Sequence, residues 1–382
     1  MPSFKTQFEC LVPIIFLLSI VAPVAGFSVE PDAEVINLLE NYRIDESDQP
    51  VRDFPGWQPP RHVVMFVPSF VEAIRPDYKQ WIQEAVGDAR VTFSAELSDL
   101  RAAAVDAEVV LGRCQAITEA STSLRWFHRY GSGMEACLRN PALQDEAVLL
   151  TNGAGLDGPY MSEHVIAMTM MLSHRMHQYY INQLNRTWDR TPDFLASIKP
   201  IHGKNMLVVG LGGIGTHIAQ RAAALGMKVT ATRRSSREGP SYVDYVGLSH
   251  ELLALAAEAD FVVSAVPLTQ ETVGLYDEEF FRVMKDTAYF INVARGRSVV
   301  TEDLVSALQA GEIAGAGLDV TDPDPLPDSH PLWAMPNVLI TPHTSNRSGI
   351  GSIDRIILVR ENLRRYAAGE PMLNVVNRSL GY

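Results

Sequence analysis

The sequence is poor in cysteine, in basic charge and in long apolar runs. Three of its 382 residues are cysteines, Cys10, Cys114 and Cys137, and none stands in a Cys-x-x-Cys or Cys/His spacing that binds metal. A disulfide framework and a metal site are therefore not expected, although one bridge between Cys114 and Cys137 stays open. The formal net charge of −13 argues against nucleic acid or an anionic membrane surface as a partner. A small molecule is the expected partner.

The one markedly apolar stretch lies at the N-terminus. Lys5 precedes a run over 11–21 that only Pro13 and Ser19 interrupt, and the small residues of Val24-Ala25-Gly26 follow. The run is too short for a bilayer span, which needs about 20 apolar residues. The layout over 1–26 is typical of a secretory signal peptide. A buried N-terminal helix and a start codon placed too early are the alternatives.

The remainder of the chain alternates short apolar strands with helical segments. A Pro- and Asp-rich lead-in over 45–60 is expected to be irregular. Apolar strands and one helix, over 69–85, then predict a small parallel-sheet domain. Its strands are expected at 62–67, 91–93, 109–111, 124–130 and 148–150. A Met-rich helix over 159–180 follows, whose apolar spacing favours a packed core or a subunit contact over a ligand pocket.

From Lys204 onwards the alternation is more regular. Six strands separated by helices fit a doubly wound dinucleotide-binding fold. They are expected at 206–210, 228–232, 261–266, 288–292, 314–318 and 338–341. A helix over 350–368 and a short strand over 374–376 end the chain.

A glycine-rich turn stands between the first of these strands and a helix. Gly210 permits the tight turn, Gly212 lets the backbone approach a pyrophosphate, and Gly215 allows close packing of helix on strand. Gly213 and Ile214 open the helix whose N-terminus would face the phosphates. The strand–turn–helix context predicts a dinucleotide site.

The residues after the second strand indicate which dinucleotide. NAD-specific sites carry an acidic residue there, which accepts hydrogen bonds from the ribose hydroxyls. This sequence has Arg233 and Arg234, followed by Ser235. Two guanidinium groups cannot accept those bonds, but they can hold a 2′-phosphate. The sequence predicts a preference for NADP(H), with NAD(H) possible if the arginines form a solvated loop in an enzyme of dual specificity.

Three further segments stand out. They are Asn292-Val293-Ala294-Arg295-Gly296, Gly317-Leu318-Asp319-Val320 with its continuation Asp322-Pro323-Asp324-Pro325-Leu326, and Thr341-Pro342-His343. Together they resemble the D-isomer-specific 2-hydroxyacid dehydrogenases, and among them the NADP-preferring glyoxylate and hydroxypyruvate reductases. Each follows an expected strand, at the edge of the sheet where open α/β proteins bind ligands. The resemblance also covers the loop over 131–135 and the start of the Met-rich helix.

The resemblance implies hydride transfer between a nicotinamide and a 2-oxo or 2-hydroxy acid. His343 is suited to give or take the proton of the carbonyl oxygen. Asp324 stands where a carboxylate would orient that imidazole, and Arg295 would polarise the carbonyl and pair with the substrate carboxylate. Backbone N–H groups of Gly131, Ser132 and Gly133 are candidates for the other side of that carboxylate. The resemblance also implies cofactor contacts from Val266, Pro267, Ala294, Arg295 and Asp319.

One position departs from the family. The family usually has Glu where Asp324 stands, and aspartate is one methylene shorter, about 1.5 Å in reach. Either a small backbone adjustment or a water restores the pair with His343, or the pair is lost and catalysis weakens. A carboxylate at this position, where formate-oxidising relatives have Gln, favours 2-oxo acid chemistry.

The fold that the resemblance implies has two Rossmann-like doubly wound domains. A nucleotide-binding domain over 158–345 would be inserted into a smaller, flavodoxin-like substrate domain formed by 27–157 and 346–382. The site would lie between them, and relatives are usually homodimers. A nucleotide-gated binding protein of the same fold, with weak or no turnover, is the alternative, and only Asp324 favours it. Location stays open, since the N-terminal stretch suggests export and the cofactor suggests the cytoplasm.

Overall fold

The structure is a computed structural model that describes residues 32–42, 44–68, 71–346 and 351–378. The predicted signal peptide over 1–26 lies outside the described residues. Within those ranges, no helix is both long and apolar enough to cross a membrane.

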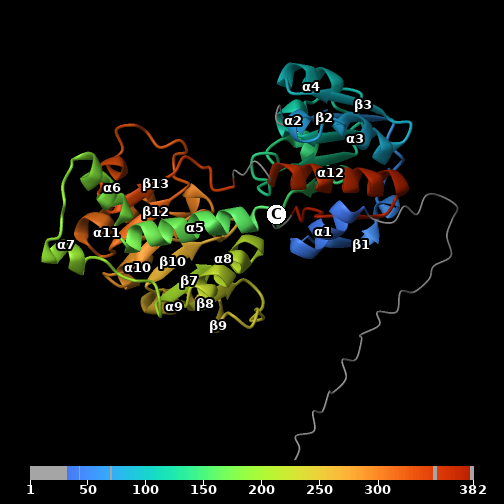
Figure 1. Cartoon of the computed structure of the whole chain (residues 1–382). Helices are drawn as coiled ribbons and strands as arrows, with labels where there is room; N and C mark the ends of the chain where they lie inside the picture. The colour runs from blue at the N-terminus through green and yellow to red at the C-terminus, as the bar shows by residue number, and fades with distance from the viewer. Residues whose placement is uncertain (1–31, 43, 69–70, 347–350, 379–382) are drawn as a thin grey trace, which may run out of the picture. The chain divides into compact units, whose positions relative to one another are not determined.

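Five parallel strands form one sheet of the described chain, in the order β3-β2-β4-β5-β6 (Figure 1). Counted along the chain, this is the order 2-1-3-4-5 of flavodoxin-like folds. The strands are β2 (His62–Phe66), β3 (Arg90–Ser94), β4 (Val109–Gly112), β5 (Trp126–Arg129) and β6 (Leu149–Asn152). The connections contain α2 (Val71–Ile74), α3 (Tyr78–Val86), α4 (Leu97–Ala103), η2 (Cys114–Ala116) and η3 (Pro141–Leu143).

The alternation of side chains along these strands builds a core on each face of the sheet. Val63 and Met65 of β2 pack in one apolar cluster with Ile82 of α3, whereas Val64 packs in another with Leu100 of α4. All five of these positions are fully or almost fully buried. The helix expected over 69–85 is divided into α2 and α3, because Pro76 lacks a backbone N–H and disfavours helix at the residue before it.

The segment before β2 and the end of the chain pair with each other. The irregular lead-in predicted over 45–60 is wrong at its start, where β1 (Glu46–Pro50) pairs antiparallel with β14 (Pro371–Leu373). The strand predicted over 374–376 is also misplaced. Asn374 has a left-handed φ of 54°, which ends β14, and beyond it only Val375 forms a single bridge. The remaining elements here are α1 (Ala33–Asn41), η1 (Val51–Asp53) and α12 (Gly351–Ala368).

The Met-rich segment forms two helices rather than the single helix predicted over 159–180. Helix α5 (Gly158–Ser173) ends and α6 (Met176–Leu184) begins around Arg175, whose φ of 54° is left-handed and breaks the helical path. A short helix, α7 (Pro192–Ala196), follows. Met161 and Met168 of α5 are buried in a core cluster, so this part of the methionine stripe is core. Helix α5 packs on α8, β11 and β12 (Figure 1).

Seven parallel strands make the larger sheet of the described ranges, in the order β13-β12-β11-β10-β7-β8-β9. This is a doubly wound dinucleotide-binding order, with the reversal between β7 and β10. The strands are β7 (Asn205–Val209), β8 (Lys228–Arg233), β9 (Tyr245–Leu248), β10 (Phe261–Ser264), β11 (Tyr289–Asn292), β12 (Gly315–Leu318) and β13 (Val338–Ile340). The helical connections are α8 (Gly213–Ala224), η4 (Ser249–Glu251), α9 (Leu252–Glu258), α10 (Glu278–Val283), η5 (Gly296–Ser298), α11 (Thr301–Ala310) and η6 (Pro331–Ala334).

The predicted fold class, α/β with two Rossmann-like sheets, is confirmed, but the count of six strands in the larger sheet is wrong. Strand β9 is the additional one. It is a four-residue edge strand that begins at the exposed Tyr245, so it lacks the continuous apolar run that marks a central parallel strand.

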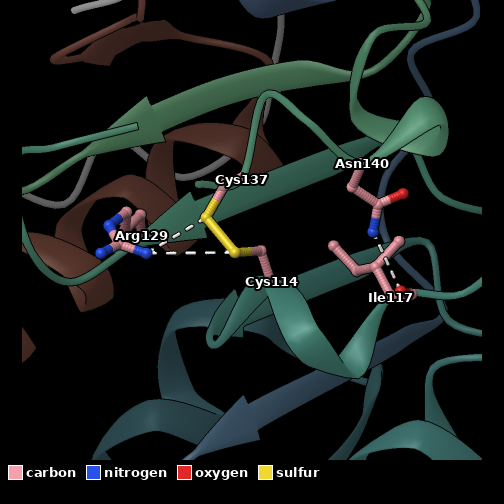
Figure 2. The surroundings of a disulfide bond; sticks show 5 residues. All are labelled: Cys114, Ile117, Arg129, Cys137 and Asn140. Carbon is pink, nitrogen blue, oxygen red and sulfur yellow. Dashed lines mark hydrogen bonds between the residues drawn. A yellow bond between two sulfur atoms is a disulfide. The ribbon is translucent and has the colours of Figure 1, made fainter. Parts of the chain in front are cut away.

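Cys114 and Cys137 form a disulfide, with their Cα atoms 5.5 Å apart (Figure 2). The bridge that the sequence left open is therefore present. It joins η2, after β4, to the segment that follows the loop over 131–135. Both cysteines are buried, and Nη1 of Arg129 donates to Cys137 Sγ at 3.1 Å.

Candidate active site

The glycine loop joins β7 to α8 in a conformation that requires glycine. Gly210 has a φ of +96°, and a Cβ there would lie 2.8 Å from the carbonyl oxygen of Ala265. A Cβ on Gly215 would overlap the carbonyl oxygen of Gly210, whereas one on Gly212 would meet open space. Helix α8 starts at Gly213 without a capping side chain, so its first N–H groups, including that of Ile214, point to a ligand position. The loop fits a pyrophosphate.

Arg233 ends β8 at the same edge of the sheet. Among the described residues its buried Nε has no hydrogen-bond acceptor, although a buried unpaired donor is costly. Arg234 and Ser235 are exposed. Arg237, by contrast, is paired with Glu251 at 2.7 Å. The unpaired guanidinium at Arg233 fits an anion such as a 2′-phosphate.

The segments after β10 and β11 reach the same edge. Val266 lies against the glycine loop, since a Cβ on Gly210 would be 3.1 Å from its Cγ1. The carbonyl oxygen of Pro267 accepts a bond from Thr272 Oγ1 at 2.7 Å. Ala294 is buried, and its N–H donates to Asn292 Oδ1 at 3.0 Å. The bond between Ala294 and Asn292 fixes the turn from which Arg295 extends.

His343 follows β13, and its ring is paired with Asp324. The His343 Nδ1 atom lies 2.6 Å from Asp324 Oδ2, with the two side chains 48% and 41% exposed. The shorter aspartate therefore reaches the imidazole directly. When the Nδ1–H group donates a hydrogen bond to the carboxylate, Nε2 is the nitrogen that faces a substrate. The backbone carbonyl oxygen of Asp322, in the same loop, accepts a hydrogen bond from Thr301 Oγ1 at 2.9 Å.

Asp319 anchors the turn that carries His343. Its carboxylate accepts hydrogen bonds from Thr341 Oγ1 at 2.6 Å and from the backbone N–H groups of Thr344 and Ser345, at 2.9 and 3.0 Å. Burial alone would raise the pKa of the Asp319 carboxyl, but these hydrogen bonds outweigh it and hold the pKa below its ordinary value. The carboxylate is fully buried, and besides this turn it lies 3.9 Å from Nε2 of His164.

Two residues near this turn were missed as site residues by the sequence reading. Thr341 Oγ1 bonds to Asp319, and the ring of His164, on α5, lies 3.0 Å from the same oxygen. His164, which lies in α5, was not predicted as a site residue from the sequence. Helix α5 packs against β12, the strand that precedes Asp319, and so brings His164 to this turn.

Arg295 contacts the loop after β5. Its Nε donates to Glu135 Oε1 at 3.0 Å, and its Nη1 donates to the carbonyl oxygen of Ala294 at 2.8 Å. A side chain on Gly133 would overlap the guanidinium, so the loop over 131–133 lies directly against it. Within the described ranges, the backbone N–H groups of Ser132 and Gly133 have no acceptor. Glu135 was not predicted as a site residue from the sequence.

The site residues that the larger sheet contributes gather at one of its edges for a geometric reason. The strands are parallel, so Gly210, Arg233, Val266, Arg295 and His343 all lie at or after the carboxyl ends of strands. β13 and β11 are separated by β12, which places the segments carrying His343 and Arg295 about 10 Å apart. No cluster of His, Cys, Asp and Glu suited to a metal ion occurs in the part of the chain that the structure describes. The sheet order and the glycine loop define a dinucleotide-binding protein of the doubly wound class.

Comparison with known proteins identifies the family. Residues 166–345 match the model of the D-isomer specific 2-hydroxyacid dehydrogenase NAD binding domain. A glyoxylate reductase of Korarchaeum cryptofilum (strain OPF8) is 32% identical over 310 residues, 80% of this chain and 88% of that protein. The chain belongs to the D-isomer-specific 2-hydroxyacid dehydrogenase family.

Solved structures agree with this assignment. A D-isomer specific 2-hydroxyacid dehydrogenase family protein of Aeromonas salmonicida subsp. salmonicida A449 has a TM-score of 0.72 and 29% identity, covering 83% of this chain and 99% of that one. A D-isomer specific 2-hydroxyacid dehydrogenase of Xanthobacter autotrophicus Py2, in complex with NADPH and MES, has a TM-score of 0.67 and 27% identity, covering 84% and 99%. The chain is thus a 2-hydroxyacid dehydrogenase or reductase that acts on CH–OH donors with a nicotinamide cofactor.

Proposed function

We propose that this enzyme is an NADPH-preferring reductase of small 2-oxo acids such as glyoxylate or hydroxypyruvate, forming the D-2-hydroxy acid reversibly. The observation that carries the proposal is the 2.6 Å contact of His343 with Asp324, at the sheet edge that also presents Arg295. The nucleotide-binding domain of the proposal is 158–345, and the substrate domain is 27–157 with 346–382.

Each residue has a separate task in this proposal. The nicotinamide supplies the hydride when it is bound. Arg295 polarises the substrate carbonyl and pairs with the carboxylate, whose other side meets the N–H groups of Ser132 and Gly133. His343 delivers a proton from Nε2 to the carbonyl oxygen, and Asp324 stabilises the imidazolium before the transfer.

The preference for NADPH rests on Arg233 and Arg234. The buried Nε of Arg233 without an acceptor and the exposed Arg234 offer charge-assisted bonds to a 2′-phosphate. The ribose hydroxyls of NAD(H) would find no carboxylate at the end of β8. NAD(H) binding is therefore expected to be weaker.

Turnover distinguishes this function from its alternative. Purified protein is mixed with NADPH and a panel of 2-oxo acids, and the loss of NADPH absorbance is followed. Oxidation of NADPH with at least one acid supports the proposal, and folded protein that binds NADPH but turns over none of them refutes it. The direct His343–Asp324 contact supports turnover over pure binding.

We also propose that the enzyme is a homodimer. The segment over 171–195 exposes an unusual number of large apolar side chains, and Trp188 is 90% exposed. The others are Met171, Met176, Tyr180, Ile181, Leu184 and Leu195. A second copy of the chain would cover them. Light scattering should give the mass of a dimer, and Leu184→Glu with Trp188→Glu should give that of a monomer; a monomeric wild type would refute the proposal.

A further inference from the structure

Glu135 holds the guanidinium of Arg295. Nε of Arg295 donates to Glu135 Oε1 at 3.0 Å, and both side chains are roughly two-thirds buried, at 31% and 28% exposed. The two residues come from different sheets, since Glu135 follows β5 and Arg295 follows β11. A partly buried pair of this kind orients the arginine more firmly than a surface pair would.

The contacts of Arg295 leave one edge of its guanidinium for a substrate. Nε is bonded to Glu135 and Nη1 to the carbonyl oxygen of Ala294, so the plane of the group is fixed. Nη2 lies over Gly133, where a Cβ would overlap it and would also come within 2.7 Å of Glu135 Oε2. Nη2 therefore lies against the loop over 131–133, and in the proposed function a substrate carboxylate would bind beside it.

The segment that carries Glu135 is itself anchored. Cys137, two residues further on, is bonded to Cys114, and Nη1 of Arg129 donates to its sulfur at 3.1 Å (Figure 2). On the other side of the loop, Asn152 Nδ2 donates to the carbonyl oxygen of Ser132 at 2.9 Å. Glu135 thus holds Arg295 from a fixed position.

The charged side chains around Arg295 carry a net positive charge. Arg129 and Arg295 are cationic, and both interact electrostatically with Glu135. Burial lowers the pKa of the Arg129 guanidinium, Arg295 lowers it further, and Glu135 raises it. The nearby Asp157 is paired with Arg355, and that pair is neutral overall. Two cations and one anion leave a single positive charge, which one substrate carboxylate neutralises. A second substrate carboxylate would be repelled by the carboxylate of Glu135, because no positive charge would remain to neutralise it.

We propose that Glu135 is a positioning and specificity-determining residue, which orients Arg295 and favours 2-oxo acids with one carboxylate over those with two. The proposal rests on the reductase function above. The repulsion between two like charges about 6 Å apart in a partly buried site is large enough for a discrimination of tenfold or more.

Two substitutions separate the two roles. Glu135→Gln keeps an acceptor oxygen for Arg295 but removes the charge, so the ratio of kcat/KM for oxaloacetate to kcat/KM for glyoxylate should rise about tenfold or more. Glu135→Ala removes the acceptor as well, so kcat should fall and KM should rise for both acids. Glu119→Gln, at an exposed glutamate in the same half of the chain, is the matched charge control and should leave the ratio unchanged.

Binding supplies the second readout. The Kd of a monoanionic analogue, oxamate, and of a dianionic one, tartronate, is measured by calorimetry with NADP⁺ present, and melting curves verify that each variant is folded. A wild type without turnover, in which Glu135→Gln still shifts the Kd ratio towards tartronate, would refute the reductase function but support the role of Glu135. Equal ratios in wild type and Glu135→Gln, by kinetics or by binding, would overturn the inference.

Discussion

His343 and Asp324 are in direct contact, with Nδ1 and Oδ2 2.6 Å apart, although the aspartate is shorter than the usual glutamate of the family. The backbone makes up the difference. His343 has a left-handed φ of 52°, and its N–H donates to the carbonyl oxygen of Asp319 at 2.9 Å. The turn directs the imidazole towards the Pro-rich loop that carries Asp324.

This contact predicts graded losses of activity. His343→Ala should lower kcat by about 10²–10⁴-fold, because it removes the proton donor. Asp324→Asn should cost less, and Asp324→Glu should retain most of the rate, because a carboxylate is kept. Steady-state kinetics measure the rates and NADPH titration provides the control, since the Kd of NADPH should not change. Retention of full kcat by His343→Ala would rule out the assigned proton donor.

The sequence predicted the parts of the fold and site that leave a local signal. The glycine loop and the buried strand before it are contiguous, so Gly210, Gly212 and Gly215 could be identified together. β1 and β14 could not, because each is short, polar or proline-containing and acquires its structure from a partner far along the chain. Glu135 was missed for the same reason, because only its contact with Arg295, 160 residues away along the chain, makes it part of the site.

The break between α5 and α6 illustrates a different limit. Periodic apolar residues continue through the segment, so the pattern predicts one helix over 159–180. The path is interrupted at Arg175, which has no side-chain property that forbids helix. A propensity scale gives only the helix preference of each residue type, so it does not indicate this left-handed residue.

Arg233 should determine the preference between the two nicotinamide cofactors. Arg233→Gln is expected to weaken NADPH binding by about 10–100-fold and to leave NADH binding nearly unchanged, because a charge-assisted bond contributes about 1.5–3 kcal/mol. Fluorescence titration gives both Kd values. Arg237→Gln, in the same segment but at a guanidinium already paired with Glu251, is the control and should have a smaller effect on NADPH. Equal weakening of both cofactors would argue against a 2′-phosphate contact at Arg233.

The disulfide should contribute to stability through the loop that it closes. Cys114 and Cys137 are 23 residues apart, and a closed loop of that length corresponds to about 3 kcal/mol in the free energy of unfolding. The double variant Cys114→Ser/Cys137→Ser should show that loss in urea unfolding. Thiol titration of the wild-type protein under denaturing, non-reducing conditions provides the control and should detect neither cysteine. Unchanged stability, or free thiols at both positions, would contradict the prediction.

His128 should make the enzyme sensitive to acid. It is fully buried in β5, where Nδ1 lies 2.8 Å from Thr151 Oγ1, and burial lowers its pKa to about 3. An unfolded histidine titrates near pH 6.5. Between these two values the unfolded chain binds a proton that the folded chain does not. The contribution of neutral His128 is therefore complete above about pH 6.5 and is lost progressively below it, by about 1.4 kcal/mol per pH unit.

A substitution isolates this slope from the titration of other groups. His128→Gln is neutral at every pH and retains a polar group for Thr151, so its free energy of unfolding should fall less steeply between about pH 6.5 and pH 5. Urea unfolding at several pH values gives the slopes, which can be compared even if the variant is less stable overall. His250→Gln, at an exposed histidine, should keep the wild-type slope. If His128→Gln also keeps it, the imidazole of His128 is not excluded from water in the way that its burial implies, and the packing of β5 against β6 must open to admit a proton.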